Sequence, residues 1–226
     1  MIVKPKVRGF ICTTAHPVGC EAVVKSEIDY VKSKKAEDNG FKPKKVLVLG
    51  SSMGYGLASR ISLAFAGGAA TLGVMFDRPA SGNKTGTSGW YNTQAFEKYA
   101  KADGLYARTV NGDAYSDECK KEVIDIIKSD LGRVDCVVYS LAAPRRTVGD
   151  VTYSSVLKTT GEPYTNKTID LRNNTVSEVT IEPATEDEIT ATVKVMGGED
   201  WAAWIDALKA ADAIEDNAVT VAYSYI

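Results

Sequence analysis

An apolar run followed by three closely spaced glycines constrains this chain more than any other feature. Residues 46–49 are Val-Leu-Val-Leu. They are followed by Gly50, Gly54 and Gly56, and residues 57–66 then have helical spacing. A short run that is apolar on both sides indicates a buried parallel strand. Glycine directly after such a strand permits a tight turn, and a later glycine lets the next helix pack close to the sheet. The segment therefore predicts a strand, a tight loop and a helix in direct succession.

Strand-like and helix-like segments alternate around that loop. Apolar, β-branched runs at 71–76, 105–110 and 134–139 indicate further strands, while residues 17–31, 91–102 and 116–131 have helical spacing. Strands joined through helices lie parallel, and the crossovers are right-handed. The sequence therefore predicts an α/β fold: a Rossmann-like doubly wound parallel sheet with helices on both faces.

The pattern changes after residue 144, where proline, glycine and threonine become frequent. The short alternation of apolar and polar residues within 175–182 indicates a hairpin. Thr185 followed three residues later by Glu188 is a capping-box signature for the start of a helix. Trp201 and Trp204 are expected to be packing aromatics on one face of a further helix.

These patterns predict how the chain is divided. We expect an N-terminal extension over residues 1–45 and an NAD-binding Rossmann-like domain over residues 46–226. A β-hairpin and helix insertion on the substrate side is expected at about residues 144–184. Residues 219–226 are strand-like and no closing element follows, so the fold is expected to be incomplete at the C-terminus.

Composition excludes several classes of protein. The chain has 27 lysines and arginines against 29 acids, a net charge of -2, which disfavours a nucleic-acid binder. No apolar run approaches the roughly 18 residues of a membrane span. The four cysteines have no zinc-site spacing, and the single histidine cannot support a multi-histidine metal site. We expect a cytoplasmic protein with free thiols, no metal and no membrane span.

The three glycines also suit a phosphate-binding loop. Glycine lets the backbone approach a pyrophosphate, which backbone N–H groups and the helix N-terminus then hold. The spacing G-x3-G-x-G is typical of relatives of the short-chain dehydrogenases. Three glycines alone also fit a plain tight turn, but the flanking strand and helix favour a dinucleotide site.

Two acids and a small-residue string follow later strands. Asp77 lies 27 residues after Gly50, where an acid accepts hydrogen bonds from the adenosine ribose and repels a 2′-phosphate, so NAD is favoured over NADP. Its neighbour Arg78 weakens that preference, and a solvated acid is the alternative. Asp113 either contacts the adenine ring or caps a helix. Residues 140–143 either approach the nicotinamide-side ribose or simply pack a strand end.

Several strings, in order along the chain, resemble the single-chain trans-2-enoyl-CoA and enoyl-carrier-protein reductases, a family related to the short-chain dehydrogenases. They are Met1-Ile-Val-Lys-Pro5, His16-Pro-Val-Gly-Cys20, Gly54-Tyr-Gly-Leu-Ala-Ser-Arg-Ile61, Gly89-Trp-Tyr-Asn92, Gly112-Asp-Ala114, Val138-Tyr-Ser-Leu-Ala-Ala-Pro-Arg-Arg146, Val195-Met-Gly-Gly-Glu-Asp-Trp201 and Ala222-Tyr-Ser-Tyr-Ile226. Residues 149–175 match less closely, so the resemblance implies no acyl-chain preference.

The resemblance implies a cofactor, a substrate and a set of site residues. Hydride would pass from NADH to Cβ of an enoyl thioester of coenzyme A or acyl-carrier protein, in fatty-acid metabolism, and the full-length protein would be a monomer. NADH would be bound by Gly50, Ser51, Ser52, Met53, Gly54, Tyr55, Phe76, Asp77, Asp113, Ala114, Leu141 and Ala142. Tyr225 would contact the substrate.

The catalytic pair of the family is not found in this chain. In the family a tyrosine supports the enolate oxygen and assists protonation, and a lysine follows after eight intervening residues. No tyrosine here has that lysine, so we assign no catalytic residue and expect the pair just after Ile226. Tyr30 and Lys34 have the spacing of ordinary short-chain dehydrogenases but precede the first strand. This 226-residue chain is therefore expected to bind NADH weakly or not at all, without turnover.

Two other functions stay open at this point. A short-chain ketoreductase would share the fold, but residues 140–143 lack the Asn-Asn-Ala-Gly pattern typical of that family. A non-catalytic NAD(H)-binding module would bind NADH and act on neither enoyl nor keto thioesters.

Two smaller features have alternative interpretations. Arg145 and Arg146 either meet carrier phosphates or form a solvated pair. His16 is expected to have a local hydrogen-bonding or packing role.

Overall fold

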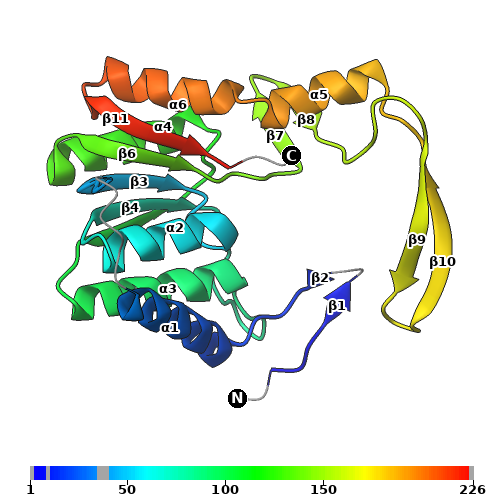
Figure 1. Ribbon diagram of the computed structural model, residues 1–226, viewed down its shortest axis with the longest axis horizontal. Helices are drawn as coiled ribbons and strands as arrows, with labels where there is room; N and C mark the ends of the chain where they lie inside the picture. Colours follow the sequence, from blue (N-terminus) through cyan, green and yellow to red (C-terminus); the bar gives the residue numbers. More distant parts are fainter. Residues whose placement is uncertain (1–2, 9–10, 35–40, 224–226) are drawn as a thin grey trace. The chain divides into compact units, whose positions relative to one another are not determined.

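A five-stranded parallel sheet forms the centre of the first of two units in this computed structural model, which describes residues 3–8, 11–34 and 41–223 (Figure 1). The strands are β3 (Lys45–Leu49), β4 (Ala70–Met75), β5 (Ala107–Asn111), β6 (Val134–Tyr139) and β11 (Ile214–Ala222). Their order is β11-β6-β3-β4-β5, with parallel pairing throughout. The chain runs outward from β3 to β5 and then returns to β6 on the other side of β3. The predicted Rossmann-like doubly wound sheet is confirmed.

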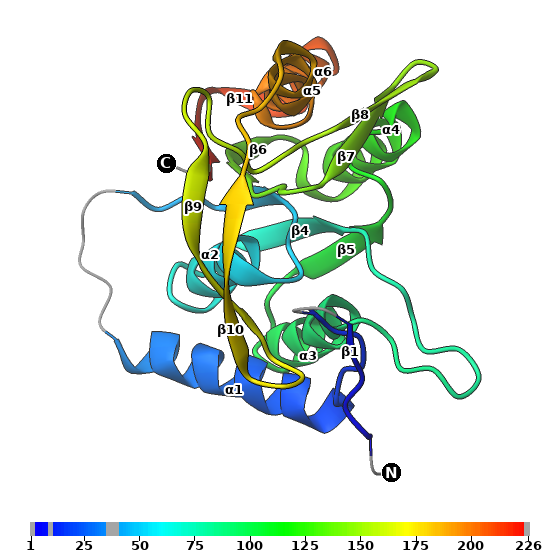
Figure 2. The same ribbon diagram turned by 90° about the vertical axis from the view of Figure 1, so that its right-hand side faces the viewer.

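Helices cover both faces of this sheet, as the alternating sequence pattern predicts. The first unit comprises residues 1–5, 14–141 and 204–226. Figure 2 shows α2 and α4 on opposite sides of the strands. The helices are α1 (Pro17–Ser33), α2 (Gly54–Phe65), α3 (Ser88–Ala102) and α4 (Asp117–Ile126), which continues as the π-helical segment η1 (Ile127–Leu131).

Burial of both sheet faces explains why the strands are apolar runs. Val46 and Val48 of β3 and Val138 of β6 form a buried cluster against which Leu63 of α2 packs. A second cluster joins α1, α2 and α3 and includes Val24, Ile28, Leu57, Ile61 and Phe96. These clusters fix α2, and with it the glycine-rich loop, against the sheet.

His16 has the predicted local role at the start of α1. Its Nδ1 atom accepts a hydrogen bond from the Gly19 backbone N–H at 3.0 Å, and Pro17 occupies the first turn. Pro is suited to that position because its missing N–H would have no partner within the helix. The histidine therefore acts as a helix cap.

A buried arginine joins α2 to strands β4 and β5. The Arg60 side chain is 0% exposed; Nε donates to Thr71 Oγ1 at 3.2 Å and Nη1 to Thr109 Oγ1 at 2.9 Å. Its guanidinium lies 4.3 Å from the centre of the Phe96 ring. Burial lowers the pKa of Arg60 to about 10, so it remains charged at neutral pH. Gly73 makes room for it, since a Cβ there would lie 2.5 Å from Nη1.

The second unit comprises residues 6–13 and 142–203, and its boundary with the first falls inside helix α6 (Glu199–Ala210). It contains three antiparallel strand pairs and helix α5 (Glu186–Met196). The pairs are β1 (Val7–Arg8) with β2 (Ile11–Cys12), β7 (Arg145–Val148) with β8 (Val151–Ser154), and β9 (Tyr164–Asp170) with β10 (Thr175–Ile181). The predicted hairpin near residues 175–182 and the capping box of α5 are both present. The β1–β2 and β7–β8 pairs were not predicted.

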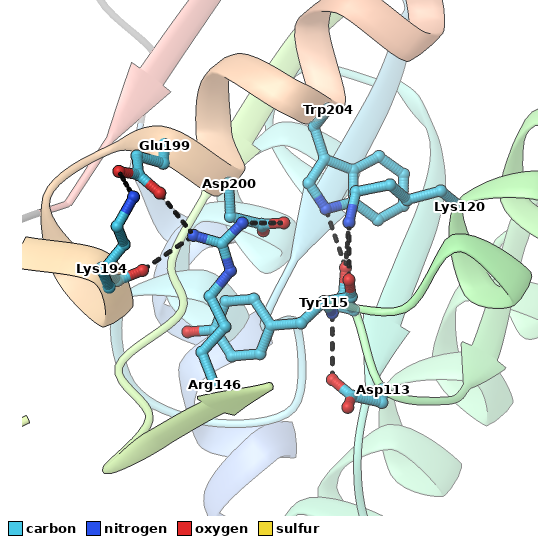
Figure 3. A network of polar contacts seen from close by, with 9 residues as sticks. Asp113, Tyr115, Lys120, Arg146, Lys194, Glu199, Asp200 and Trp204 are labelled. Carbon is cyan, nitrogen blue, oxygen red and sulfur yellow. Dashed lines mark hydrogen bonds and ion pairs between the residues drawn. The ribbon is translucent and has the colours of Figure 1, made fainter. Parts of the chain in front are cut away.

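Arg146 is not a solvated loop residue. Its side chain is 10% exposed, and Nη1 donates to the Lys194 carbonyl at 2.7 Å and lies 3.5 Å from Glu199 Oε2 (Figure 3). Nη2 lies 3.9 Å from Oδ1 of the buried Asp200. Arg146 therefore joins β7 to the end of α5 and the start of α6 within the second unit.

Across the described ranges, the structure contains no helix that is both long and apolar enough to cross a membrane.

Candidate cofactor-binding site

The predicted site residues follow the carboxyl ends of four neighbouring strands in the first unit. Parallel strands end at one edge of the sheet, and ligands of such folds bind where the strand order reverses, here between β3 and β6. Residues 50–55 follow β3, Phe76 and Asp77 follow β4, Asp113 and Ala114 follow β5, and Leu141 follows β6. Ala142 belongs to the second unit, and Tyr225 lies outside the described residues.

Close backbone approach explains two of the three loop glycines. Gly50 has φ +79°, and a Cβ there would collide with the Ser140 carbonyl oxygen at the end of β6. A Cβ on Gly56 would collide with the Gly50 carbonyl oxygen. Gly54 has φ +54° with open space around its Cβ position, so conformation alone favours glycine there. The loop backbone therefore packs directly against the end of β6 and against the start of α2, which side chains at Gly50 and Gly56 would prevent.

The loop is anchored to β4 and leads into an uncapped helix. The backbone N–H groups of Gly50 and Ser51 donate to the Val74 carbonyl at 3.0 and 2.9 Å, and Ser51 Oγ donates to it at 3.1 Å. Helix α2 starts with Met53 as N-cap, whose side chain makes no capping hydrogen bond to the described first turn, and that turn holds no acid. A helix N-terminus of this kind favours an anion, because its N–H groups and dipole present positive charge.

Asp77 is held by groups that sequence reasoning missed. Thr87 Oγ1 donates to Asp77 Oδ1 at 2.6 Å. Asn111 Nδ2 donates to the Asp77 carbonyl at 2.8 Å, and the Asp77 N–H donates to Asn111 Oδ1 at 2.9 Å. Gly89 leaves room for the carboxylate, since a Cβ there would lie 2.6 Å from Oδ1. Gly89 belongs to one of the strings that carry the family resemblance, which was the available signal.

Asp113 stabilises the loop between β5 and α4. Its Oδ1 accepts from the Tyr115 N–H at 3.0 Å, and its carbonyl accepts from Ser116 Oγ at 2.9 Å. Ser116 also caps α4 by accepting from the Cys119 N–H at 3.1 Å. The helix cap considered for Asp113 is therefore wrong, because Ser116 is the cap of α4 and Asp113 stabilises the turn before it. Buried Ala114 completes this loop.

Two exposed aromatic side chains flank the glycine-rich loop. Phe76 is 80% exposed and Tyr55 is 71% exposed. The Tyr55 ring stacks on Tyr223, with ring centres 5.1 Å apart and an interplanar angle of 15°. The Tyr223 hydroxyl lies 2.8 Å from Ser59 Oγ of α2. The start of α2 is thereby linked to the residue that follows β11.

Within the residues that the structure describes, no group of three or more histidine, cysteine, aspartate or glutamate side chains is arranged to hold a metal ion.

The sheet order and the loop define the class of protein: a Rossmann-like α/β fold with a glycine-rich loop at its topological switch point. Residues 84–226 match the family model described as the trans-2-enoyl-CoA reductase catalytic region, and residues 2–82 match the model described as the NAD(P)H binding domain of trans-2-enoyl-CoA reductase. The chain belongs to the trans-2-enoyl-CoA reductase family.

Similar proteins agree with this assignment. A trans-2-enoyl-CoA reductase (NADH) of Ruminiclostridium cellulolyticum is 60% identical over 229 residues, covering 100% of this chain and 57% of that protein. An enoyl-(acyl-carrier-protein) reductase (NADH) of Opitutus terrae is 59% identical with the same coverage. The crystal structure of Treponema denticola trans-2-enoyl-CoA reductase in complex with NAD superposes with a TM-score of 0.94 at 49% identity, covering 100% of this chain and 58% of that one. The chain thus spans about 57% of the length of these curated relatives.

Proposed function

We propose that this chain is the cofactor-binding portion of an NADH-dependent reductase of trans-2-enoyl thioesters. The observation that carries the proposal is the closely packed glycine-rich loop at the switch point, followed along the same sheet edge by the anchored Asp77. Similar proteins are named for coenzyme A and for acyl-carrier-protein substrates, which share an enoyl thioester. The substrate class is therefore an enoyl thioester of either carrier, reduced to the acyl thioester in fatty-acid metabolism.

The proposed roles of the site residues follow from where they lie. The loop Gly50, Ser51, Ser52, Met53, Gly54 and Tyr55 holds the pyrophosphate at the start of α2. The Asp77 carboxylate accepts hydrogen bonds from the adenosine ribose hydroxyls and repels a 2′-phosphate, which favours NADH over NADPH. Phe76, Asp113 and Ala114 border the adenosine, while Leu141 and Ala142 border the nicotinamide-side ribose, and Tyr225 contacts the substrate. Bound NADH supplies the hydride.

The proposal also includes a division of the chain and a cellular setting. Residues 1–45 form an extension, residues 46–226 the cofactor domain, and about 144–184 a substrate-side insertion. The full-length protein is a cytoplasmic monomer.

Cofactor binding tests the proposal directly. The 226-residue chain, titrated with NADH and NADPH and followed by nuclear magnetic resonance, is expected to bind NADH weakly and NADPH more weakly still. Asp77→Asn should reduce the preference for NADH over NADPH about tenfold, since a hydrogen bond to a charged group contributes about 1.5 kcal/mol. Asp125→Asn, on the exposed side of α4, is the matched control.

Several outcomes would contradict the proposal. A preference for NADPH, or no binding of NADH by the full-length protein, would remove the cofactor assignment. NADH consumption with crotonyl-CoA would show that the catalytic groups lie within these 226 residues, contrary to the assignment made here. NADH binding by the full-length protein without activity on any enoyl or keto thioester would indicate a non-catalytic module.

A further inference from the structure

A buried polar clamp holds the loop that joins β5 to α4. The Trp204 side chain is 0% exposed, and its Nε1–H donates to the Ala114 carbonyl at 3.0 Å. Lys120, 7% exposed, donates through Nζ to the carbonyls of Ala114 and Tyr115 at 3.2 and 3.0 Å (Figure 3). Its ammonium also lies 5.3 Å from the centre of the Trp204 ring. All four residues belong to the first unit.

Packing alone does not explain this arrangement. A buried ammonium and a buried indole N–H are costly unless both are hydrogen-bonded, so an apolar pair would fill the same space at less expense. Here both donors converge on one backbone carbonyl, that of Ala114, which is 90 residues from Trp204 in sequence. The clamp therefore fixes the backbone of this loop.

The loop is fixed from its other end by its own side chains. Asp113 Oδ1 accepts from the Tyr115 N–H, and Ser116 donates to the Asp113 carbonyl. With the clamp on Ala114 and Tyr115, every residue from 113 to 116 has a hydrogen bond that restrains it. The side chain of Asp113 remains exposed at the carboxyl edge of the sheet.

We propose that Trp204 and Lys120 are positioning residues for the adenosine half of the dinucleotide. The proposal rests on the function given above, in which Asp113 and Ala114 meet the adenosine. The clamp acts on the loop after β5, whereas the nicotinamide side of the site follows β6. Loss of the clamp should therefore weaken binding of the adenosine half and leave the nicotinamide half unaffected.

The test compares two halves of the cofactor on the 226-residue chain. AMP and reduced nicotinamide mononucleotide are titrated separately and followed by nuclear magnetic resonance, which detects weak binding. Trp204→Phe keeps an aromatic ring and removes the N–H, and Lys120→Met keeps the stem and removes the ammonium. Each variant should raise the Kd for AMP about fivefold to tenfold, the effect of one or two buried hydrogen bonds, without changing the Kd for the mononucleotide.

Two further variants sharpen the test. Lys121→Met is the matched control, because Lys121 is the next residue of α4, pairs with Asp125 and has a side chain 78% exposed. Its Kd values should equal those of the wild type. The double variant Lys120→Met, Trp204→Phe should weaken AMP binding by less than the product of the single effects, since both side chains act on one carbonyl.

Each outcome decides the matter. Equal weakening of AMP and of the mononucleotide would show a general structural role and overturn the inference. If the wild type binds AMP and the variants bind it equally well, the positioning role of Trp204 and Lys120 would be overturned, while the cofactor assignment would stand. If the wild-type chain binds neither AMP nor NADH, the same variants are compared in the full-length protein, and absence of binding there too would overturn the cofactor assignment and this inference with it. If Trp204→Phe does not fold, as judged by circular dichroism, Lys120→Met carries the test.

Discussion

Two glycines of the cofactor loop are required for different physical reasons. Gly56 is required because a Cβ would collide with the backbone carbonyl of Gly50, which is fixed by its own turn. Gly54 is required only by its positive φ, since no atom lies within 4 Å of its Cβ position. Alanine at the two positions should therefore have different consequences.

We expect Gly56→Ala to lower the free energy of unfolding by about 3 kcal/mol, the upper part of the range for overpacking. Gly54→Ala should lower it by about 1 kcal/mol, the cost of a left-handed conformation for a residue with a Cβ. Urea unfolding followed by circular dichroism measures both values. Equal costs at the two positions would show that the collision at Gly56 is relieved by movement of the loop.

Gly89 leaves space for the Asp77 carboxylate, and we expect this space to matter more for NADH binding than for the stability of α3. A Cβ at position 89 would meet side-chain oxygens of Asp77 and Ser52, both 2.6 Å away, and these can move. Gly89→Ala should therefore leave the unfolding free energy within about 1 kcal/mol of the wild type, helped by the helix propensity of alanine. It should weaken NADH binding about tenfold, because a displaced carboxylate loses charged hydrogen bonds to the ribose.

The measurement for Gly89→Ala is an NADH titration beside a urea unfolding curve. Gly161→Ala is the control, since no atom lies within 4 Å of its Cβ position. Unchanged NADH affinity in Gly89→Ala would show that the carboxylate of Asp77 does not need this position.

Among the elements, η1 is tied to the sheet by Asp130. Ser129 Oγ donates to Asp130 Oδ1 at 2.6 Å, while the Tyr106 hydroxyl and Arg108 Nη1 donate to Oδ2 at 2.6 and 3.0 Å. These hydrogen bonds, that of Ser129 first, lower the pKa of Asp130 from 3.8 to about 2. The pKa of Tyr106 is raised to about 12 by partial burial and then by Asp130. The ionised carboxylate therefore stabilises this junction.

The sign of the pH dependence follows from that lowered pKa. The stabilising contribution of Asp130 is fully present above the unfolded pKa of 3.8 and is lost as pH falls toward the folded value of about 2. Asp130→Asn should be less stable than the wild type at pH 7, and its stability should fall less steeply between pH 4 and pH 2. Urea unfolding at pH 7, 4, 3 and 2 measures this, with Asp125→Asn as control. Parallel curves for the variant and the wild type would contradict it.

The elements that could be predicted are those whose burial produces a hydrophobic pattern in the sequence. Strands β3 and β6 are buried on both faces and therefore appear as apolar runs. Strands β7 and β8 are four residues each and mostly exposed, so neither a run nor an alternation marks them. The strand pair β1–β2 has two residues a side, too few for any period.

The placement of the candidate site residues along one sheet edge was predictable, but the contacts that support them were not. The carboxyl ends of β3 to β6 and the glycine spacing can be obtained from sequence periodicity. The hydrogen bonds of Asp77 with Thr87 and Asn111 span 10 and 34 residues, and that of Trp204 with Ala114 spans 90. Such pairings depend on tertiary packing, which no local pattern records.

On the scale of the whole molecule, the two units differ in how deeply their strands are buried. In the first unit, Val46, Leu47, Val48 and Leu49 of β3 are all 0% exposed. In the second unit, the β9–β10 ribbon exposes apolar side chains on both of its faces, with Val176 59% and Val179 41% exposed. A two-stranded ribbon with little burial is marginally stable by itself.

Hydrogen exchange should separate the two units. Backbone amides of β9 and β10 are expected to exchange at least about a hundredfold faster than those of β3 and β6, because local opening requires less free energy where few apolar contacts are lost. Exchange followed by mass spectrometry on the 226-residue chain measures this. Equal protection of the ribbon and the sheet would contradict the expectation and indicate that the ribbon is covered in solution.

The fit between Arg60 and Gly73 has a consequence for the history of the sequence. A Cβ at position 73 would lie 2.5 Å from Arg60 Nη1 and also 2.5 Å from Oγ of Ser51 in the glycine-rich loop. A side chain at position 73 therefore requires both Arg60 and Ser51 to move or to be replaced. Among relatives, a side chain at the position of Gly73 should accompany changes at the positions of both Arg60 and Ser51, so three codons are expected to diverge together.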